Sequence, residues 1–215
     1  MAFDIRFFIQ NPIRLITVPL TKLPYFKFIR ETADYQCPNS FEIWFKQKVL
    51  NWGGNRAAYW PVHWTSKVYD ANKILVGVDA CPGVMNGCYI QGKGGIEIGD
   101  HTQIAPNVSI LSANHDVYDT RKHIMAPVKI GKYCWIGAGA SILPGVVLGD
   151  WTIVGAGAVV TTSFADGYCI LTGVPATKLR DLERSKCVHY SHGKHYHGYI
   201  PAAKFEDFRK RKLNV

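Results

Sequence analysis

Histidine is the residue in this sequence best suited to proton transfer or metal binding. One of its eight histidines, His115, lies in residues 114–127 (NHDVYDTRKHIMAP), a segment that interrupts an otherwise regular apolar pattern. A neutral imidazole can take a proton from a hydroxyl group near neutral pH, because its pKa lies close to that pH. Loops carried by a rigid scaffold often hold such residues, so His115 is the first candidate for a catalytic base.

The six cysteines form no recognisable metal or redox motif. No pair has the C-x-x-C spacing that zinc ribbons and thioredoxin-type sites use. Cys88 and Cys134 fall on the small, inward position of the six-residue pattern described next, where a free thiol behaves as a small apolar side chain. We therefore expect reduced cysteines and a cytoplasmic location.

The scaffold that must position His115 has an apolar residue at every sixth position. A period of six fits neither an amphipathic helix nor one long strand, and it is typical of a parallel β-helix. Three hexads make one triangular turn of eighteen residues, so Ile136 is predicted to stack beneath Val154. The repeat is carried by Val78, Val84 and Ile90, then, after a two-residue shift, by Ile98, Ile104 and Ile110, and later by Ile130, Ile136, Ile142, Leu148, Val154 and Val160.

The repeat divides the chain into a coil and two flanking regions. The coil is expected over residues 61–176, with residues 114–127 leaving it as a loop. Between Ile110 and Ile130 the gap is twenty residues rather than eighteen. The repeat therefore predicts an all-β fold, a parallel β-helix with additional segments at both ends.

The two flanking regions have different compositions. Residues 1–60 predict a helical and irregular N-terminal cap, in which residues 41–50 (FEIWFKQKVL) have helical spacing after the capping candidate Ser40. Residues 177–215 predict a C-terminal helix, beginning at residues 177–186 (TKLRDLERSK), followed by a basic tail.

Charge is concentrated in the tail. The net charge is +9, and residues 178–215 hold ten Lys or Arg against four Asp or Glu. Such a tail can be a solvated surface, or it can attract nucleic acid, an anionic membrane or a phosphate-bearing cofactor. No RNA-binding aromatic platform or DNA-reading helix is identifiable, so we expect no nucleic-acid partner.

The N-terminal residues are apolar but interrupted by Arg6, Arg14, Lys22 and Lys27. The longest uncharged stretch is too short for the ~20 apolar residues that span a bilayer. No cleavage site of small residues follows an apolar core, so we expect no signal peptide. Packing on the coil is the preferred role for this segment, with a peripheral membrane contact as the lesser alternative.

Beyond the bare repeat, an ordered set of motifs resembles the hexapeptide-repeat acyltransferases, especially the galactoside, maltose and nodulation-type O-acetyltransferase branch. The resemblance covers residues 84–182 and implies a left-handed β-helix, acetyl-CoA as co-substrate, a carbohydrate acceptor, no required metal, and a homotrimer with active sites between subunits. The motifs are Ile98-Gly99-Asp100, Ile104-Ala105-Pro106-Asn107-Val108, Asn114-His115-Asp116, Trp135-Ile136-Gly137, Leu143-Pro144-Gly145-Val146, Val154-Gly155-Ala156-Gly157-Ala158-Val159-Val160 and Gly173-Val174-Pro175-Ala176.

The resemblance assigns roles to particular residues. It implies that His115 is the general base, flanked by Asn114 and Asp116 at the acceptor site. Asn86, in the preceding turn of the coil, would hydrogen-bond the acceptor, although an outward polar corner residue is an equal interpretation. The family's galactoside enzymes carry an acidic residue a few positions later, where this chain has residues 91–94 (QGKG), so the acceptor is left open.

The same resemblance implies a cofactor-binding set. Trp135 would lie beside the pantetheine arm, and the backbone amides of Ala138 and Ala156 would pair with the pantetheine amides. Lys178 and Arg180 fall in the family's basic stretch near the phosphates. Thr162 stands where relatives often have Lys, and the tail is an alternative source of phosphate contacts.

Four alternatives remain open from the sequence. N-acetylation of an amino sugar and O-acetylation of a xenobiotic both fit the same base and coil. A γ-type carbonic anhydrase would need three histidines on zinc, for which His101, His115 and His123 are candidates with unsuitable spacing. A binding module without catalysis is disfavoured by the pairing of His115 with Trp135. The tail histidines are His189, His192, His195 and His197; we expect them to be solvated, with adventitious metal binding as the lesser alternative.

Overall fold

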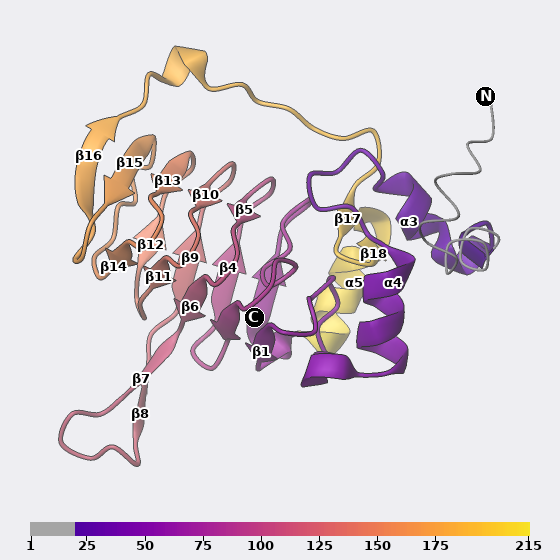
Figure 1. Ribbon diagram of the computed structural model, residues 1–215, viewed down its shortest axis with the longest axis horizontal. Coiled ribbons are helices and arrows are strands. Elements are labelled where there is room, and N and C mark those ends of the chain that lie inside the picture. The colour runs from indigo at the N-terminus through magenta and orange to yellow at the C-terminus, as the bar shows by residue number, and fades with distance from the viewer. Residues whose placement is uncertain (1–19) are drawn as a thin grey trace.

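A stack of parallel strands forms the centre of the computed structural model, which describes residues 20–215 (Figure 1). The strands fall into three sheets, which we call faces A, B and C of the coil. Face A contains β1 (Lys67–Tyr69), β3 (Tyr89–Gln91), β6 (Ser109–Leu111), β11 (Ser141–Ile142) and β14 (Val159–Val160). Face B contains β2 (Ile74–Val76), β4 (Ile96–Ile98), β9 (Val128–Ile130) and β12 (Val147–Leu148). Face C contains β5 (Gln103–Ile104), β10 (Trp135–Ile136), β13 (Thr152–Val154), β15 (Cys169–Thr172) and β16 (Thr177–Asp181).

The strand register confirms the six-residue repeat from Ile130 onward. In the first turns the paired residues are 22 and 20 positions apart, as in Val76 with Ile98 and Ile90 with Ile110, and Val78 packs with the cap instead of the coil core. Ile136 pairs with Val154, eighteen residues later, as predicted. The apolar residue of each hexad points inward, so that Ile110, Ile136 and Val160 are fully buried. Small inward residues sit beside this row, including the buried thiols of Cys88 and Cys134. The repeat therefore encodes one continuous apolar core along the axis of the coil.

The interruption of the repeat is a β-hairpin made by β7 (Ala113–His115) and β8 (His123–Met125). It projects away from the coil below the strands in Figure 1. Ile98 pairs with Ile130 across it, an offset of thirty-two residues. The expectation of a two-residue excess was therefore wrong, because fourteen residues leave the coil and return to it.

One close approach fixes the base of the hairpin. Gly94 donates its backbone N–H to Ser112 Oγ at 2.9 Å, and a Cβ on Gly94 would lie 2.0 Å from the Ser112 carbonyl oxygen. Glycine is thus required for this contact between neighbouring turns. Gln91 adds a second fixing point, since its Oε1 accepts the Ala113 N–H at 3.0 Å.

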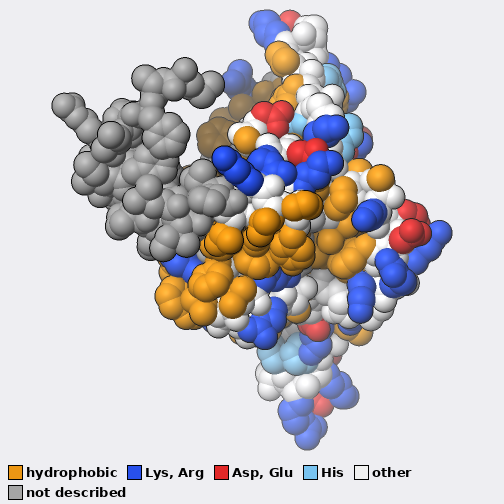
Figure 2. Space-filling model, turned by 90° about the vertical axis from the view of Figure 1, so that its right-hand side faces the viewer, with side chains coloured by type: hydrophobic (Ala, Val, Ile, Leu, Met, Phe, Trp, Pro, Cys, Tyr) orange, Lys and Arg blue, Asp and Glu red, His pale blue; other side chains and the backbone are white. Residues whose placement is uncertain are grey.

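Helices and aromatic side chains cover the first turn of the coil. The described part of the cap contains the 3-10 turn Pro24–Phe26, α3 (Lys27–Glu31), α4 (Phe41–Trp44), the π-helical turn Phe45–Val49 and the 3-10 turn Trp52–Gly54. Ser40 caps α4 as predicted, because its Oγ accepts the Ile43 N–H at 3.2 Å. Figure 2 shows hydrophobic side chains gathered over this end of the molecule. The expectations for residues 1–19, including packing or membrane contact, lie outside the described residues.

The C-terminal region differs from its prediction. Residues 177–186 do not form a helix: Thr177–Asp181 is a strand antiparallel to β15, and Arg184–Lys186 is a 3-10 turn. Pairing with the last strand of face C outweighs the weak helical preference of this stretch. The helix of this region is α5 (Ala202–Lys212), which follows the small hairpin of β17 (Tyr196–His197) and β18 (Ile200–Pro201).

The segment between β16 and β17 runs back along the coil to the capped end (Figure 1). We call residues 187–195 the return strap. It is held to the coil and cap by hydrogen bonds, from Tyr133 Oη to the Tyr190 carbonyl at 2.7 Å and from Tyr35 Oη to the Lys194 carbonyl at 2.9 Å.

Within residues 20–215, no helix has both the length and the apolarity needed to cross a membrane.

Candidate active site

His115 ends β7, at the base of the hairpin tip, and its side chain is exposed. Its Nδ1 lies 2.5 Å from the Thr120 carbonyl oxygen. A carbonyl oxygen only accepts, so Nδ1 carries the proton and Nε2 keeps its lone pair. The hairpin therefore presents His115 in the tautomer that a general base requires.

His123 lies directly across the hairpin from His115. The two residues are register partners, and their ring centroids are 4.4 Å apart. Partial desolvation lowers the pKa of His123, and the nearby charges of Lys93 and His115 lower it further. His123 was considered only as a metal ligand from the sequence, and its place on the opposite strand could have been inferred only from the hairpin register.

Asp116 shapes the loop that carries Thr120. Its Oδ1 accepts the backbone N–H groups of Tyr118 at 2.8 Å and Asp119 at 3.0 Å, forming a local turn. Asn114, exposed, stands opposite Ile124 on the hairpin. The structure therefore places both predicted acceptor residues beside His115, with part of the Asp116 carboxylate committed to the loop backbone.

The tip of the hairpin is basic. Figure 2 shows histidine above a group of Lys and Arg side chains on the lowest projection of the molecule. Arg121 contacts Asp119 at 2.8 Å and Lys122 contacts Asp119 at 3.6 Å. These exposed ion pairs add order to the tip but little stability.

Trp135 lies on face C, and its side chain is 56% exposed. Ala138 and Ala156 follow on the corner where face C leads into face A, one turn apart and both exposed. The Ala138 carbonyl accepts the Gly157 N–H at 2.8 Å, which binds the two turns together. Asn86 occupies the same corner further along the axis, where its carbonyl accepts the Asn107 N–H at 2.9 Å.

His115 and Trp135 do not meet within one chain. The hairpin leaves the coil where face A leads into face B, whereas Trp135 lies on face C, on the opposite side of the prism (Figure 1). Asn86 accompanies Trp135 and the two alanines rather than His115. The predicted residues therefore form two half-sites, the hairpin half-site with His115 and the corner half-site with Trp135.

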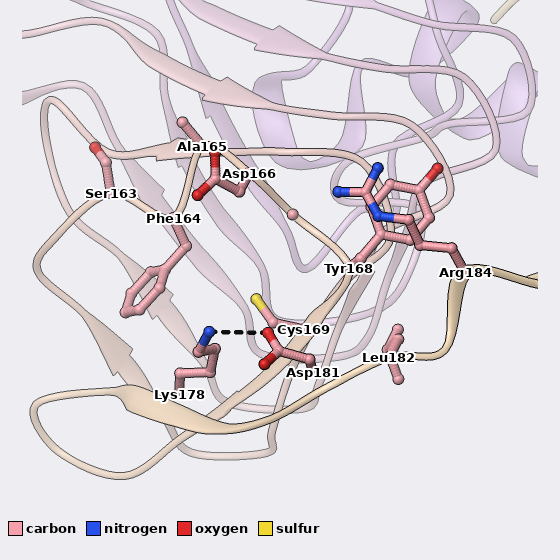
Figure 3. A pocket seen from close by; sticks show the side chains of 11 residues that line it. Ser163, Phe164, Ala165, Asp166, Tyr168, Cys169, Lys178, Asp181, Leu182 and Arg184 are labelled. Carbon is pink, nitrogen blue, oxygen red and sulfur yellow. Dashed lines mark hydrogen bonds and ion pairs between the residues drawn. The ribbon is translucent and has the colours of Figure 1, made fainter.

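The basic residues predicted to meet phosphate gather near the last turn of the coil. A pocket of about 420 Å³ is lined by Ser163, Tyr168, Lys178, Asp181 and Arg184 among others (Figure 3). In Figure 3 the Lys178 ammonium points at Asp181, and the two groups are 2.8 Å apart. This contact raises the pKa of Lys178, so the ammonium stays protonated, and the negative charge of Asp181 partly offsets its positive charge.

The other two residues predicted near the phosphates are both exposed. Arg180 is exposed on β16, opposite Ile170, and Thr162 is exposed at the end of β14. Arg184 was not predicted, yet its guanidinium carbon stands 4.0 Å from the centre of the Tyr168 ring. The reversal at residues 173–176, between β15 and β16, brings Arg184 back over the coil. Gly173 and Pro175 indicate a turn there, but no local signal shows that the chain then pairs with β15.

The histidines considered for a carbonic-anhydrase zinc site do not converge in the described chain. His115 and His123 share the hairpin, whereas His101 lies on the corner between faces B and C. His101 is buried there at 6% exposure.

Comparison with known proteins supports the resemblance. The family model described as bacterial transferase hexapeptide (six repeats) matches residues 127–162. The resemblance to the hexapeptide-repeat acyltransferases is confirmed.

The chain is 37% identical over 100 residues to the galactoside O-acetyltransferase of Escherichia coli (strain K12), covering 44% of this chain and 48% of that protein. It is 46% identical over 63 residues to nodulation protein L of Rhizobium meliloti (strain 1021), covering 27% and 34%. Among solved structures, a maltose O-acetyltransferase from Clostridium difficile 630 is 31% identical, with 56% and 60% coverage and a TM-score of 0.43. The chain spans about half the length of the curated relatives it matches.

Proposed function

We propose that this protein is an acetyl-CoA-dependent O-acetyltransferase that acts on a carbohydrate hydroxyl group. The single observation that carries the proposal is the hydrogen bond from His115 Nδ1 to the Thr120 carbonyl, which leaves Nε2 as a base at the hairpin. The relatives named as O-acetyltransferases support the same reaction class. The exposed, polar setting of His115 suits a hydroxyl-rich acceptor.

The reaction follows from this tautomer. Nε2 of His115 takes the proton of the acceptor hydroxyl while its oxygen attacks the thioester carbonyl carbon of acetyl-CoA. A carbon–oxygen bond forms, and the resulting oxyanion is stabilised by backbone N–H groups at a coil corner. The carbon–sulfur bond then breaks, and the departing thiolate of CoA takes the proton from the His115 imidazolium. His115 returns to its neutral form, and no acyl-enzyme is needed.

The corner half-site supplies the place for the acetyl donor. Trp135 offers an exposed aromatic face for the pantetheine arm, and the backbone at Ala138 and Ala156 offers amides on successive turns. Lys178, Arg180 and Thr162, near the last turn, lie where the phosphates would bind. Lysine and arginine suit phosphate because they combine charge with several hydrogen-bond donors.

The two half-sites imply a second copy of the chain. His115 of one subunit would complete the corner half-site of its neighbour, because the two lie on opposite sides of one coil. A closed ring of three coils satisfies this requirement at three identical interfaces. We therefore propose a homotrimer of left-handed coils, with each active site between two subunits.

The test is a thiol-release assay with acetyl-CoA across a panel of sugars, nucleotide sugars, amino sugars and chloramphenicol-like alcohols. Wild-type protein is expected to release CoA with at least one hydroxyl acceptor, and the acetyl ester is identified by mass spectrometry. Sedimentation should give a trimer. Transfer only to amines would replace O-acetylation by N-acetylation, and a monomer would overturn the shared site.

A further inference from the structure

A second group of histidine and carboxylate side chains converges far from the hairpin. Asp79, His101 and His192 place one ligand atom each within 4.8 Å of one another. Asp79 and His101 occupy the same corner of successive turns, where face B leads into face C, and His192 comes from the return strap. Asp79 and His192 therefore meet here although they are 113 positions apart in the sequence.

The three side chains are buried. The side chain of Asp79 is fully buried, and those of His101 and His192 are exposed by 6% and 8%. Such groups are costly to bury unless each polar atom has a partner. A solvated tail, as expected from composition, does not describe His192.

One atom in the group lacks a partner. Among residues 20–215, His101 Nδ1 is one of three buried side-chain atoms that make no hydrogen bond. It stands 4.0 Å from Asp79 Oδ2, which is too long for a hydrogen bond. His101 has φ 60° and stays in a backbone conformation unusual for a residue with a Cβ. The coil thus holds His101 Nδ1 near the Asp79 carboxylate, but no described residue forms a hydrogen bond with it.

The remaining atoms are held in a ligand-like arrangement. His192 Nε2 lies 2.9 Å from Asp79 Oδ2, and its Nδ1 lies 3.2 Å from Asp34 Oδ2. A histidine bound to metal through one nitrogen usually donates its other N–H to a carboxylate. The Asp79 carboxylate is itself fixed, since its two oxygens accept the backbone N–H groups of Gln36 and Cys37 at 3.1 and 3.0 Å.

The spacing fits a small divalent cation. Zinc bonds to nitrogen and oxygen at about 2.0–2.2 Å, so tetrahedral ligand atoms stand roughly 3.3 Å apart. The distances of 2.9 and 4.0 Å within the group lie on either side of that value. His101 also lines a pocket of about 310 Å³ together with Gln36, Trp135 and Tyr190, so one member of the group borders an open cavity.

We propose that Asp79, His101 and His192 form a structural zinc site that fastens the return strap to the coil. Two imidazoles and one carboxylate are ligands that zinc accepts readily. The ion would supply the missing partner of His101 Nδ1 and would replace the proton between His192 and Asp79. The site lies away from the hairpin half-site, while His101 shares a pocket with Trp135 of the corner half-site. The role of the ion is to hold residues 187–195 in place rather than to activate a substrate.

The test uses the full chain, stripped with a chelator and titrated with ZnCl₂. Calorimetry should show one zinc ion per chain, and the melting temperature should rise on addition of zinc. Cobalt(II) should give the intense visible absorption of tetrahedral coordination. His101→Ala and His192→Ala should each weaken zinc binding by at least about 100-fold, and Asp34→Asn by about 10–100-fold.

Matched controls come from the strap itself. His189→Ala and His195→Ala remove exposed strap histidines outside the group and should leave the zinc affinity unchanged. If His192→Ala does not fold, His101→Asn, which leaves the strap sequence intact, carries the same expectation. Absence of saturable binding by wild-type protein would overturn the proposal. Equal losses in the control variants would overturn it as well, because they would assign binding to the His-rich tail as a whole. Acetyl transfer is measured separately, so failure of either proposal leaves the other standing.

Discussion

The hairpin of β7 and β8 and the corner between faces B and C both hold histidine, but they treat the imidazole in opposite ways. On the hairpin, His115 is exposed and its Nδ1 has a carbonyl partner 2.5 Å away. At the corner, His101 is buried and its Nδ1 has no partner among the described residues. The first arrangement leaves one nitrogen free for proton transfer, and the second leaves a nitrogen that only an added ligand can satisfy. The two histidines thus differ in whether Nδ1 meets a partner among the described residues.

The two regions also differ in how they are held. The hairpin is anchored at its base by contacts between neighbouring turns. The corner carries a ladder of rings, in which Tyr133 stacks on His101 at 5.0 Å and on Trp151 at 4.9 Å. The return strap covers this ladder, with Tyr190 against both His101 and Tyr133. Rigid packing suits a buried site, whereas an exposed hairpin can meet a second subunit.

The largest expected effect comes from His115→Ala. Loss of the general base should reduce acetyl transfer by about 10²–10⁴-fold while stability changes by less than about 0.5 kcal/mol, because the side chain is exposed. Rates with a saturating acceptor and thermal melts are measured together. His123→Ala is the matched control, and an equal loss of rate in both variants would remove the distinction between the two hairpin histidines.

Gly94→Ala tests the anchoring of the hairpin. A Cβ 2.0 Å from the Ser112 carbonyl forces neighbouring turns apart, so the free energy of unfolding should fall by about 3 kcal/mol. Denaturant unfolding measures it. Gly193→Ala, where a Cβ meets nothing within 4 Å and φ is not positive, controls for the loss of glycine alone. Equal costs at the two positions would mean that the contact with Ser112 does not matter.

Tyr133→Leu tests the ring ladder at the corner between faces B and C. The substitution removes two ring stacks and the hydrogen bond to the Tyr190 carbonyl, and it should cost about 1–2 kcal/mol. Limited proteolysis should then cut residues 187–195 sooner than in wild-type protein. Tyr133→Phe retains the stacks and should show roughly half the effect. Unchanged proteolysis in both variants would show that the strap is held elsewhere.

The smallest effect is expected for Asp116→Ala. It removes the two hydrogen bonds that shape the loop before Thr120, at a cost of about 1 kcal/mol. A looser Thr120 carbonyl should lower the acetyl-transfer rate by less than the loss of His115 itself. Asp116→Asn keeps the accepting oxygen and should restore most of the rate. If the Asn variant is as slow as the Ala variant, the carboxylate charge acts on the acceptor directly.

The sequence alone determined the coil and the candidate base. Its six-residue period places inward residues eighteen apart, so the pairing of Ile136 with Val154 could be read from spacing. The break in that period located His115. The pairing was predictable because the repeat is local: each hexad makes the same contacts with the turns on either side, whatever lies further along the chain.

The tertiary structure alone decided the course of the C-terminal region and the surroundings of each histidine. Residues 177–186 have a helical composition, yet residues 177–181 pair with β15, because an open sheet edge offers more hydrogen bonds than an isolated short helix. The meeting of His192 with Asp79 depends on a strap that crosses several turns, and no periodicity reports such a contact. Local patterns specify the elements of this protein, whereas the partners of its reactive nitrogens depend on contacts between residues far apart in sequence.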